Sequence, residues 1–483
     1  MHRKLYFVLF FLKYDILLVV YLKKVDIVFD LKKYKNIYMI GIGGISMSGL
    51  AHILASWGFN VSGSNNEENN VISGLIENGI DVKIGHNYDN INDAHDLVVY
   101  TAAVKMDNPE IVHAKELGIP VMERGLFLGE LTKLFKDTIG IAGTHGKTTT
   151  TSMVSLCFLE AGLDPSIQVG SMLNQINGNY RVGKSDYFII EACEYMDSYL
   201  NFKQKSAIIL NIDNDHMDYF KTFDNVKKSF KEYVSHLPND GLLVLNGEDK
   251  NCLELALDTN AKVITYGLDN KSNYYATNIN FDENGFGSYD LYKRDEYIDR
   301  IELSVVGPHN ILNSLACVSL CLYYGLDIDS IKRGLKNYIG AARRFEYKGE
   351  FNGAKVYDDY GHHPTEVSAV AKSILNKKYN KSWVIFEPHT YSRVKNHMID
   401  FAESLKTFDN IIITDIYAAR EENVYGVTPE DIINELKKLG KSAIHISDYE
   451  DIKEYLNENI VEDDLILTLG AGYVTKLSEM LTK

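Results

Sequence analysis

The chain has 483 residues, longer than one typical core of about 100–200 residues, and this length predicts a multidomain enzyme. It carries 50 basic and 66 acidic side chains, a net charge of −16, and this balance argues against a nucleic-acid partner. Five cysteines without a C-x-x-C pair indicate neither a disulfide framework nor a cysteine-based zinc site, and they favour reduced core thiols in a cytoplasmic protein.

The first 30 residues form a separate segment. The apolar run from Leu5 to Leu22 is long enough to suggest a membrane span, but Lys13 and Asp15 lie within it. Each of these charges would cost about 2.5–3.5 kcal/mol at a bilayer centre, and no small-residue cleavage site of a signal peptide follows. We therefore expect residues 1–30 to be an extension without function, with an amphiphilic helix or membrane tether as the alternative. We expect no stable membrane association.

Residues 31–136 are predicted to form a Rossmann-like domain. The stretch from Lys35 to Asn65 alternates strand, glycine-rich turn, helix and strand. The turn nearly matches the dinucleotide fingerprint, but Ser46 holds the third glycine position and no acid follows the second strand directly. Such a turn suits a pyrophosphate, from NAD or from a nucleotide sugar, at a helix N-terminus. Glycines that serve only strand–helix packing are the alternative.

Residues 137–341 are predicted to form a central α/β domain that begins with a phosphate loop. From Ile139 to Cys157 an apolar strand leads into a glycine-rich turn, Lys147, four threonines and a helical pattern. Backbone N–H groups of such a turn cradle an anion, the lysine adds a cation, and the Thr148 hydroxyl suits Mg²⁺. Ile141 stands where the usual G-x-x-x-x-G-K-[ST] pattern has its first glycine, so the loop is a variant. An incidental strand-to-helix turn is the alternative.

Carboxylates and an imidazole follow two later strands of this central unit. Glu191 ends one apolar strand, and Asp213, Asp215 and His216 follow another. Parallel strands present their carboxyl ends at one ligand-binding edge, so these side chains should converge on the phosphate loop. Oxygen ligands with one imidazole suit Mg²⁺ or Mn²⁺ at triphosphate oxygens. Helix caps and loop acids are the alternative.

Residues 342–483 are predicted to form a second Rossmann-like domain. Charged and aromatic side chains gather beside its apolar strands, namely Arg343, Arg344, Asp358, Asp359, Tyr360, His362, His363, His389 and Arg393. One arginine can neutralise charge on a transferred phosphoryl group, and another can grip a carboxylate. Because adjacent side chains on an extended segment diverge, we do not expect His362 and His363 to ligate one metal together.

Ordered motifs along residues 35–483 resemble those of the Mur ligases, ATP-dependent amino-acid ligases of peptidoglycan synthesis. The motifs are "GIGGISMSGLA", "GTHGKTTTT", "EACEYMDSYL", "DHMD", "GPHNILNSLA", "ARRFE", "DDYGHHPTEV", "FEPHTYSR" and "LGAGYV". The resemblance implies a UDP-binding N-terminal domain, a central ATPase domain and a C-terminal domain that closes with the amino acid. Within the family, the motifs most resemble the branch that joins L-alanine to the carboxylate of UDP-N-acetylmuramate through an acyl phosphate.

The resemblance also implies roles for individual residues. The implied catalytic residues are Lys147, Glu191, His216 and Arg344. The implied ATP contacts are Gly143, Thr144, His145, Gly146, Lys147, Thr148, Thr149, His309, Asn310, Asn313, Arg344 and Asp359. The implied metal ligands are Thr148, Glu191 and His216. The implied contacts to the UDP-sugar are Gly41, Gly43, Gly44, Ser46, Met47, Ser64 and Asn65, and those to the amino acid are Tyr360, His362, His389 and Arg393.

The sequence differs from the family pattern at one position, lacks one assignment that some relatives have, and leaves three other functions as alternatives. Asn65 stands where the family usually has Asp, which puts one polar contact to the uridine part in doubt. Family members that add later residues use a carbamoylated lysine downstream of the "DHMD" motif, whereas the alanine-adding branch generally does without it. We therefore assign this role to neither Lys227 nor Lys231. The rivals are a murein-tripeptide recycling ligase, an NAD-dependent oxidoreductase built on the first turn, and a regulatory nucleotide-binding module. Whether the chain is a monomer or a weak dimer stays open.

Overall fold

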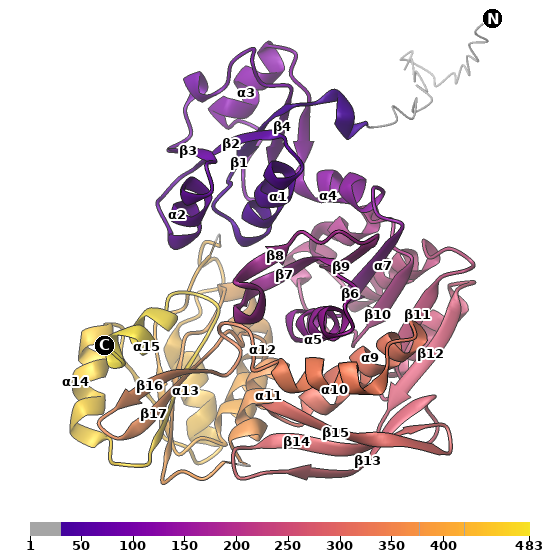
Figure 1. Ribbon diagram of the computed structural model, residues 1–483. Coiled ribbons are helices and arrows are strands. Elements are labelled where there is room, and N and C mark those ends of the chain that lie inside the picture. Colours follow the sequence, from indigo (N-terminus) through magenta and orange to yellow (C-terminus); the bar gives the residue numbers. More distant parts are fainter. Residues whose placement is uncertain (1–29, 376, 420) are drawn as a thin grey trace, which may run out of the picture.

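The computed structural model describes residues 30–375, 377–419 and 421–483 and shows three α/β domains in chain order (Figure 1). The three tandem sheets confirm the predicted architecture. The predicted extension lies outside the described residues, apart from Asp30. Within the described part of the chain, every helix is too short or too polar to cross a bilayer. All five cysteines are free, and four of them are buried.

The N-terminal domain is a five-stranded parallel sheet in the order β3-β2-β1-β4-β5. Its strands are β1 (Asn36–Ile40), β2 (Asn60–Asn65), β3 (Asp81–Ile84), β4 (Leu97–Tyr100) and β5 (Val121–Glu123). Its helices are α1 (Ile45–Ser56), α2 (Asn70–Glu77), α3 (Pro109–Glu116) and α4 (Arg124–Thr132). Strand β1 is apolar and buried from its second residue on, as a parallel strand covered on both faces should be.

The central domain has a ten-stranded sheet in the order β15-β14-β13-β12-β11-β10-β6-β9-β7-β8. Its strands are β6 (Asp137–Ala142), β7 (Ser166–Leu173), β8 (Gly178–Arg181), β9 (Tyr187–Glu191), β10 (Ser206–Ile209), β11 (Leu242–Asn246), β12 (Lys262–Gly267), β13 (Tyr274–Phe281), β14 (Phe286–Lys293) and β15 (Glu296–Val306). Its helices are α5 (Lys147–Glu160), α6 (Met217–Phe220), α7 (Phe223–Ser235), α8 (Lys250–Glu254), α9 (His309–Tyr323) and α10 (Ile328–Asn337). The buried strands β6, β9, β10 and β11 are those that the apolar runs predict.

Strands β13, β14 and β15 extend this sheet as an antiparallel ribbon that the sequence analysis does not anticipate. Half-buried and buried residues alternate along β14, a period-2 pattern that indicates one face on the core and one facing water. In Figure 1, α9 and α10 lie between this ribbon and α5. The ribbon therefore completes the packing around the helix that follows the phosphate loop.

The C-terminal domain is a six-stranded sheet in the order β16-β17-β21-β18-β19-β20, parallel except for β16. Its strands are β16 (Glu346–Phe351), β17 (Ala354–Asp359), β18 (Ser382–Phe386), β19 (Asn410–Ile413), β20 (Ile444–His445) and β21 (Leu465–Leu469). Its helices are α11 (Pro364–Ile374), α12 (Tyr391–Leu405), α13 (Pro429–Lys438), α14 (Tyr449–Asn459) and α15 (Thr475–Leu481). Two apolar clusters pack on its two faces.

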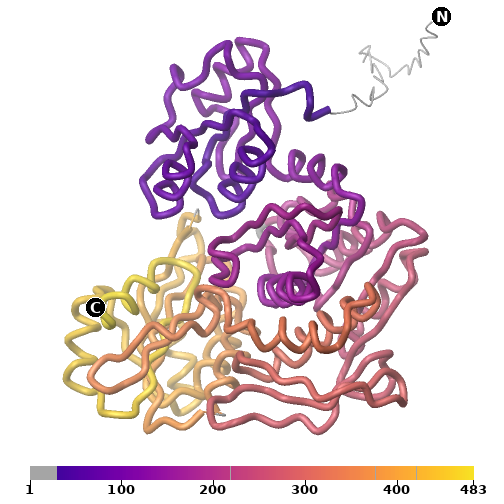
Figure 2. Tube along the Cα trace, in the orientation of Figure 1, coloured from indigo at the N-terminus to yellow at the C-terminus, as the bar shows by residue number. Residues whose placement is uncertain are grey.

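The central domain contacts both neighbours (Figure 2). On the N-terminal side, Gln168 Nε2 donates to Ser46 Oγ at 3.1 Å, and the His52 ring stacks on Tyr180 at 4.3 Å. On the C-terminal side, the backbone N–H of Ala342 donates to Met172 O at 3.1 Å. The hairpin of β7 and β8 thus lies between the first glycine-rich turn and the linker to the third domain.

Candidate active site

The predicted phosphate loop joins β6 to α5. Gly143 has φ 135° and Gly146 has φ 86°, a left-handed conformation that glycine adopts without strain. A Cβ on Gly146 would lie 2.7 Å from Asn313 Oδ1, so a side chain there would collide with α9. The loop therefore needs glycine for both its conformation and its packing.

Lys147, the first residue of α5, lies folded back over the loop. Its Nζ donates to Gly143 O at 2.5 Å and Thr144 O at 2.9 Å, and it pairs with Glu194 Oε2 at 3.0 Å. Burial alone lowers the pKa of Lys147, but the Glu194 carboxylate raises it above the ordinary value. Lys147 is thus held charged. Sequence reasoning missed Glu194, although it lies three residues after Glu191 in the quoted motif.

Thr148 and Glu191 meet beside the loop. Thr148 Oγ1 donates to Glu191 Oε1 at 3.0 Å, and the backbone N–H of Gly170 also donates to the Glu191 carboxylate. Burial raises the pKa of Glu191. These two oxygens come from the first turn of α5 and the end of β9, at the edge where parallel strands place ligands. They suit a hard divalent cation.

His216, the third predicted metal ligand, lies on the Glu194 side of the loop. Its Nε2 is 3.9 Å from Glu194 Oε1 and 3.9 Å from Asp215 Oδ2. It has φ 55° and immediately precedes α6. The predicted metal ligands therefore form two groups near Lys147. Thr148 contacts Glu191, whereas His216 lies near Glu194.

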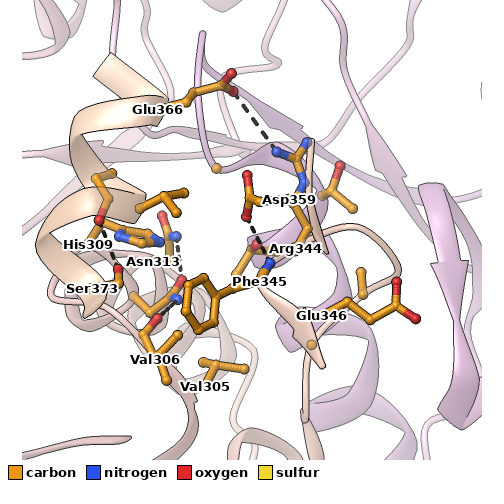
Figure 3. A pocket seen from close by; sticks show the side chains of 18 of the residues that line it. Val305, Val306, His309, Asn313, Arg344, Phe345, Glu346, Asp359, Glu366 and Ser373 are labelled. Carbon is orange, nitrogen blue, oxygen red and sulfur yellow. Dashed lines mark hydrogen bonds and ion pairs between the residues drawn. The ribbon is translucent and has the colours of Figure 1, made fainter. Parts of the chain in front are cut away.

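A cavity of about 890 Å³ opens between the central and C-terminal domains beside this loop (Figure 3). Among the residues predicted for ATP, it is lined by His145, Gly146, Thr148, Thr149, His309, Asn310, Asn313, Arg344 and Asp359. Gly143, Thr144 and Lys147 belong to the loop and are not among its lining residues. Phe345, which sequence reasoning missed, places its ring in the cavity beside Val305 and Val306 (Figure 3). One end of the cavity is thus polar and the other apolar.

Asp359, at the end of β17, organises the C-terminal wall of the cavity. Its carboxylate accepts the backbone N–H of Phe345 at 2.8 Å and that of Gly361 at 2.7 Å. Burial raises the pKa of Asp359 to about 6, although the Arg344 guanidinium acts in the opposite direction. Arg344 NH1 lies 4.0 Å from Glu366 Oε1 and reaches the same cavity.

Glu366, the third residue of α11, connects the phosphate loop to the C-terminal domain. Its carboxylate lies 3.4 Å from His145 Nδ1 and 3.3 Å from His362 Nδ1. On its other side, His145 Nε2 is 3.1 Å from Asp213 Oδ2. Burial alone lowers the pKa of His145, but the Asp213 and Glu366 carboxylates raise it to about 9. Glu366 also caps α11, and the H-x-x-E spacing is the signal that could have found it.

The four residues predicted for the amino acid form one group. The His362 ring lies 5.3 Å from that of Tyr360 and 5.2 Å from that of His389. Arg393 NH1 lies 2.7 Å from His389 Nδ1. Across the domain boundary, Arg393 NH2 donates to Asp215 Oδ1 at 2.7 Å, and both side chains are nearly buried. Asp215 therefore joins this group from the central domain.

The first glycine-rich turn forms a separate candidate site. The backbone N–H of Gly43 donates to Asn65 Oδ1 at 3.3 Å, so Asn65 closes the turn. Two predicted side chains point inward, since Met47 packs in the core and Ser64 Oγ donates to the buried Glu110 at 2.8 Å. Any contact that Met47 makes with a ligand must therefore come from its backbone.

The fold and both glycine-rich turns define a three-domain nucleotide-binding α/β protein. Family models described as Mur ligase family, catalytic domain; Mur ligase middle domain; and Mur ligase, glutamate ligase domain match residues 36–136, 141–321 and 343–472. The chain is 46% identical, over 94% of its length and 97% of the relative's, to the UDP-N-acetylmuramate--L-alanine ligase of Acetivibrio thermocellus. It belongs to the Mur ligase family.

Solved structures agree with this assignment. The UDP-N-acetylmuramate-alanine ligase of Thermotoga maritima matches with a TM-score of 0.80 and 28% identity, over 92% of this chain and 98% of that one. The MurF ligase of the same organism, solved in complex with ADP, matches with a TM-score of 0.62 and 16% identity, over 82% of this chain and 96% of that one. The second likeness concerns the fold alone.

Proposed function

We propose that this protein is an ATP-dependent ligase that joins L-alanine to the carboxylate of UDP-N-acetylmuramate, the first peptide-adding step of peptidoglycan precursor synthesis. The observation that carries the proposal is the near full-length likeness, at 46% identity, to a ligase of that name. The geometry supports it, because a phosphate loop that carries a charged lysine and an arginine from another domain both contribute residues to the lining of one cavity. The oxidoreductase and recycling-ligase alternatives are not favoured by these relatives.

ATP fits the cavity between the domains. The loop from Gly143 to Thr149 lies at the polar end, where its backbone N–H groups and Lys147 would hold the β- and γ-phosphates. The base would lie at the apolar end, beside Val305, Val306 and Phe345. Arg344 and Asp359 would complete this site when the C-terminal domain is closed.

The chemistry proceeds in two steps. An oxygen of the muramate carboxylate attacks the γ-phosphorus, and ADP leaves to give an acyl phosphate. The neutral amine of L-alanine then attacks the acyl carbon, and inorganic phosphate leaves from the tetrahedral intermediate as the amine loses its proton. Lys147 and Arg344 stabilise the charge that develops on the transferred phosphoryl group. Closure excludes water, which would otherwise hydrolyse the acyl phosphate.

Mg²⁺ fits the oxygen ligands beside the loop. Thr148 would hold one ion, and Glu191 and His216 would serve a second, with Mn²⁺ as a substitute, although His216 lies beside Glu194 and Asp215 in this structure. The ion would neutralise phosphate charge when bound. Lys227 Nζ lies 4.0 Å from Glu254 and Lys231 Nζ lies 3.6 Å from Asp258, and we assign the role of a carbamoylated lysine to neither.

The substrates occupy the two remaining sites. The pyrophosphate of the UDP-sugar would lie at the N-terminus of α1, on the backbone N–H groups from Ile45 to Met47, because those of Gly41, Ile42 and Gly44 donate to carbonyls within the domain. The carboxylate of L-alanine would bind Arg393, beside His362 and His389. We place the reaction in the cytoplasm, since five free cysteines suit a reducing compartment.

The test is ADP release from the full chain with Mg²⁺, ATP and UDP-N-acetylmuramate, with one amino acceptor at a time. The acceptors are L-alanine, glycine, L-serine and murein tripeptide. We expect release to require both the sugar nucleotide and an amino acid, with the highest kcat/KM for L-alanine. Release with the tripeptide but not with L-alanine would instead identify the recycling ligase.

A further inference from the structure

Three side chains of metal-ligating type meet across the domain boundary, apart from the candidate magnesium ligands. His145 comes from the phosphate loop, Asp213 from the segment after β10, and His363 from the residue before α11. Asp213 Oδ2 is 3.1 Å from His145 Nε2 and 3.9 Å from His363 Nδ1. One ligand atom from each lies within 4.8 Å of the other two. A four-coordinate ion with bonds of about 2.0–2.1 Å would hold such atoms about 3.3 Å apart, so His363 Nδ1 would move about 0.6 Å closer to Asp213 Oδ2.

Each imidazole of this triad has its second nitrogen beside a hydrogen-bond acceptor. His145 Nδ1 lies 3.4 Å from Glu366 Oε1, and His363 Nε2 lies 3.3 Å from Asn214 O. An ion must displace the second proton of the His145 imidazolium and the Thr365 backbone N–H that His363 Nδ1 accepts at 3.4 Å, and the two lone pairs that this frees face Asp213. Metal-ligating histidines show this arrangement, with a carboxylate or a backbone carbonyl orienting the ring from behind.

The composition of the triad selects the kind of ion. Two imidazole nitrogens and one carboxylate oxygen suit Zn²⁺, whereas Thr148 and Glu191 offer only oxygen and suit Mg²⁺. His145 and Asp213 line the cavity, which gives an ion a path from solvent. Three protein ligands also leave a fourth position open toward that cavity.

We propose that His145, Asp213 and His363 form an inhibitory site for Zn²⁺ or a similar transition-metal ion. Two ligands belong to the central domain and one to the C-terminal domain, so a bound ion ties the two domains together. Turnover requires those domains to separate and release product. The ion therefore slows ligation by holding the closed state, and the site is separate from the ions that accompany ATP.

The test uses His363→Asn in the full chain. Asparagine is a preferred helix N-cap, so this variant keeps the cap of α11 while it removes the imidazole. Zn²⁺ binding is measured by calorimetry at saturating Mg²⁺ without nucleotide, and Co²⁺ absorption reports the ligands. We expect one ion per wild-type chain, a Co²⁺ spectrum without thiolate bands, and at least about 100-fold weaker binding in His363→Asn. Zn²⁺ should inhibit wild-type ligation and spare the variant.

The matched control is His397→Asn. The His397 ring lies 5.1 Å from that of His363 but belongs outside the triad, so this variant should bind Zn²⁺ as the wild type does. Asp213→Asn should weaken binding as His363→Asn does, which keeps a test available if the first variant does not fold. Equal affinity in wild type and His363→Asn would overturn the proposal, as would equal loss in His397→Asn or a Co²⁺ spectrum with thiolate bands. None of these binding readouts depends on which amino acid the enzyme ligates.

Discussion

The two glycine-rich turns of this chain share a local design and differ in what surrounds them. Each follows a buried parallel strand and precedes a helix, with Gly41 at φ 78° and Gly146 at φ 86°. Around the first turn, the Asn65 amide accepts the Gly43 N–H, and Arg124 donates to Ser46 Oγ at 3.1 Å without a carboxylate partner in that contact. Around the second, Lys147 pairs with Glu194, and Thr148 donates to Glu191. A helix N-terminus follows the turn in both places, whereas the second turn also carries Lys147 at the start of α5 and faces carboxylates at and after the end of β9.

This difference explains how one chain can handle two phosphate-bearing ligands differently. A cradle of N–H groups binds a pyrophosphate without activating it. Phosphoryl transfer also needs groups that stabilise charge as it develops. If the protein has the proposed function, the first turn binds the UDP-sugar and the second binds ATP and stabilises the transferred phosphoryl group.

Lys147→Ala removes the charge that most distinguishes the two turns. We expect kcat for ADP release to fall by about 10³-fold, because the lysine acts on the transferred phosphoryl group. Binding of UDP-N-acetylmuramate, measured by calorimetry, should change less than about twofold, since its site lies in the other turn. Lys133→Ala is the control, since Lys133 is half-exposed and pairs with Glu130 on the surface. Wild-type turnover in Lys147→Ala would contradict the role of the loop.

Arg344→Ala tests whether the second turn needs the C-terminal domain. We expect turnover to fall by about 10²-fold while ATP affinity falls much less, because the guanidinium stabilises charge formed in the transition state. Calorimetry with ATP and steady-state ligation separate the two effects. Arg333→Ala, which removes an exposed partner of Glu160, should behave as wild type. Equal losses in affinity and turnover would instead indicate a binding role alone.

Asp215→Asn tests the coupling between the reactive turn and the amino-acid group. Without the carboxylate, Arg393 loses its buried partner from the central domain, so the KM for L-alanine should rise about tenfold, with a smaller change in the KM for ATP. Steady-state kinetics with each substrate varied in turn measures the split. Asp164→Asn breaks the more exposed pair with Arg181 and should leave both constants unchanged.

Gly41→Ala perturbs the first turn only. A Cβ there would lie 2.5 Å from Thr101 Cγ2 in a left-handed backbone conformation, whereas Gly58 has φ 86° and open space around it. Gly58→Ala should therefore lower the free energy of unfolding by about 1–2 kcal/mol from backbone strain alone, and Gly41→Ala by about 1–3 kcal/mol more from overpacking. Urea denaturation measures both values. Equal losses of unfolding free energy in the two variants would show that the Thr101 side chain moves aside without destabilising the fold.

The elements that local patterns specify were predicted well. Apolar runs located β6, β9, β10 and β11, and both turns occur where glycines interrupt an apolar strand before a helix. The side chains of the adjacent His362 and His363 point in different directions, as expected. The His362 ring lies near that of His389, whereas the His363 ring lies near that of His145. The antiparallel ribbon of β13 to β15 was not anticipated, because its half-buried strands carry a weaker apolar signal than buried parallel strands do.

The sequence by itself determined the family, the order of the three domains and the positions of the two turns, because each depends on residues close together in the chain. Only the tertiary structure decided which carboxylate faces Lys147, that Glu366 lies between His145 and His362, and that Asp215 pairs with Arg393. The last pair is separated by 178 residues. No local propensity encodes such a contact, since it forms only when two independently patterned domains pack with their strand ends facing one cavity.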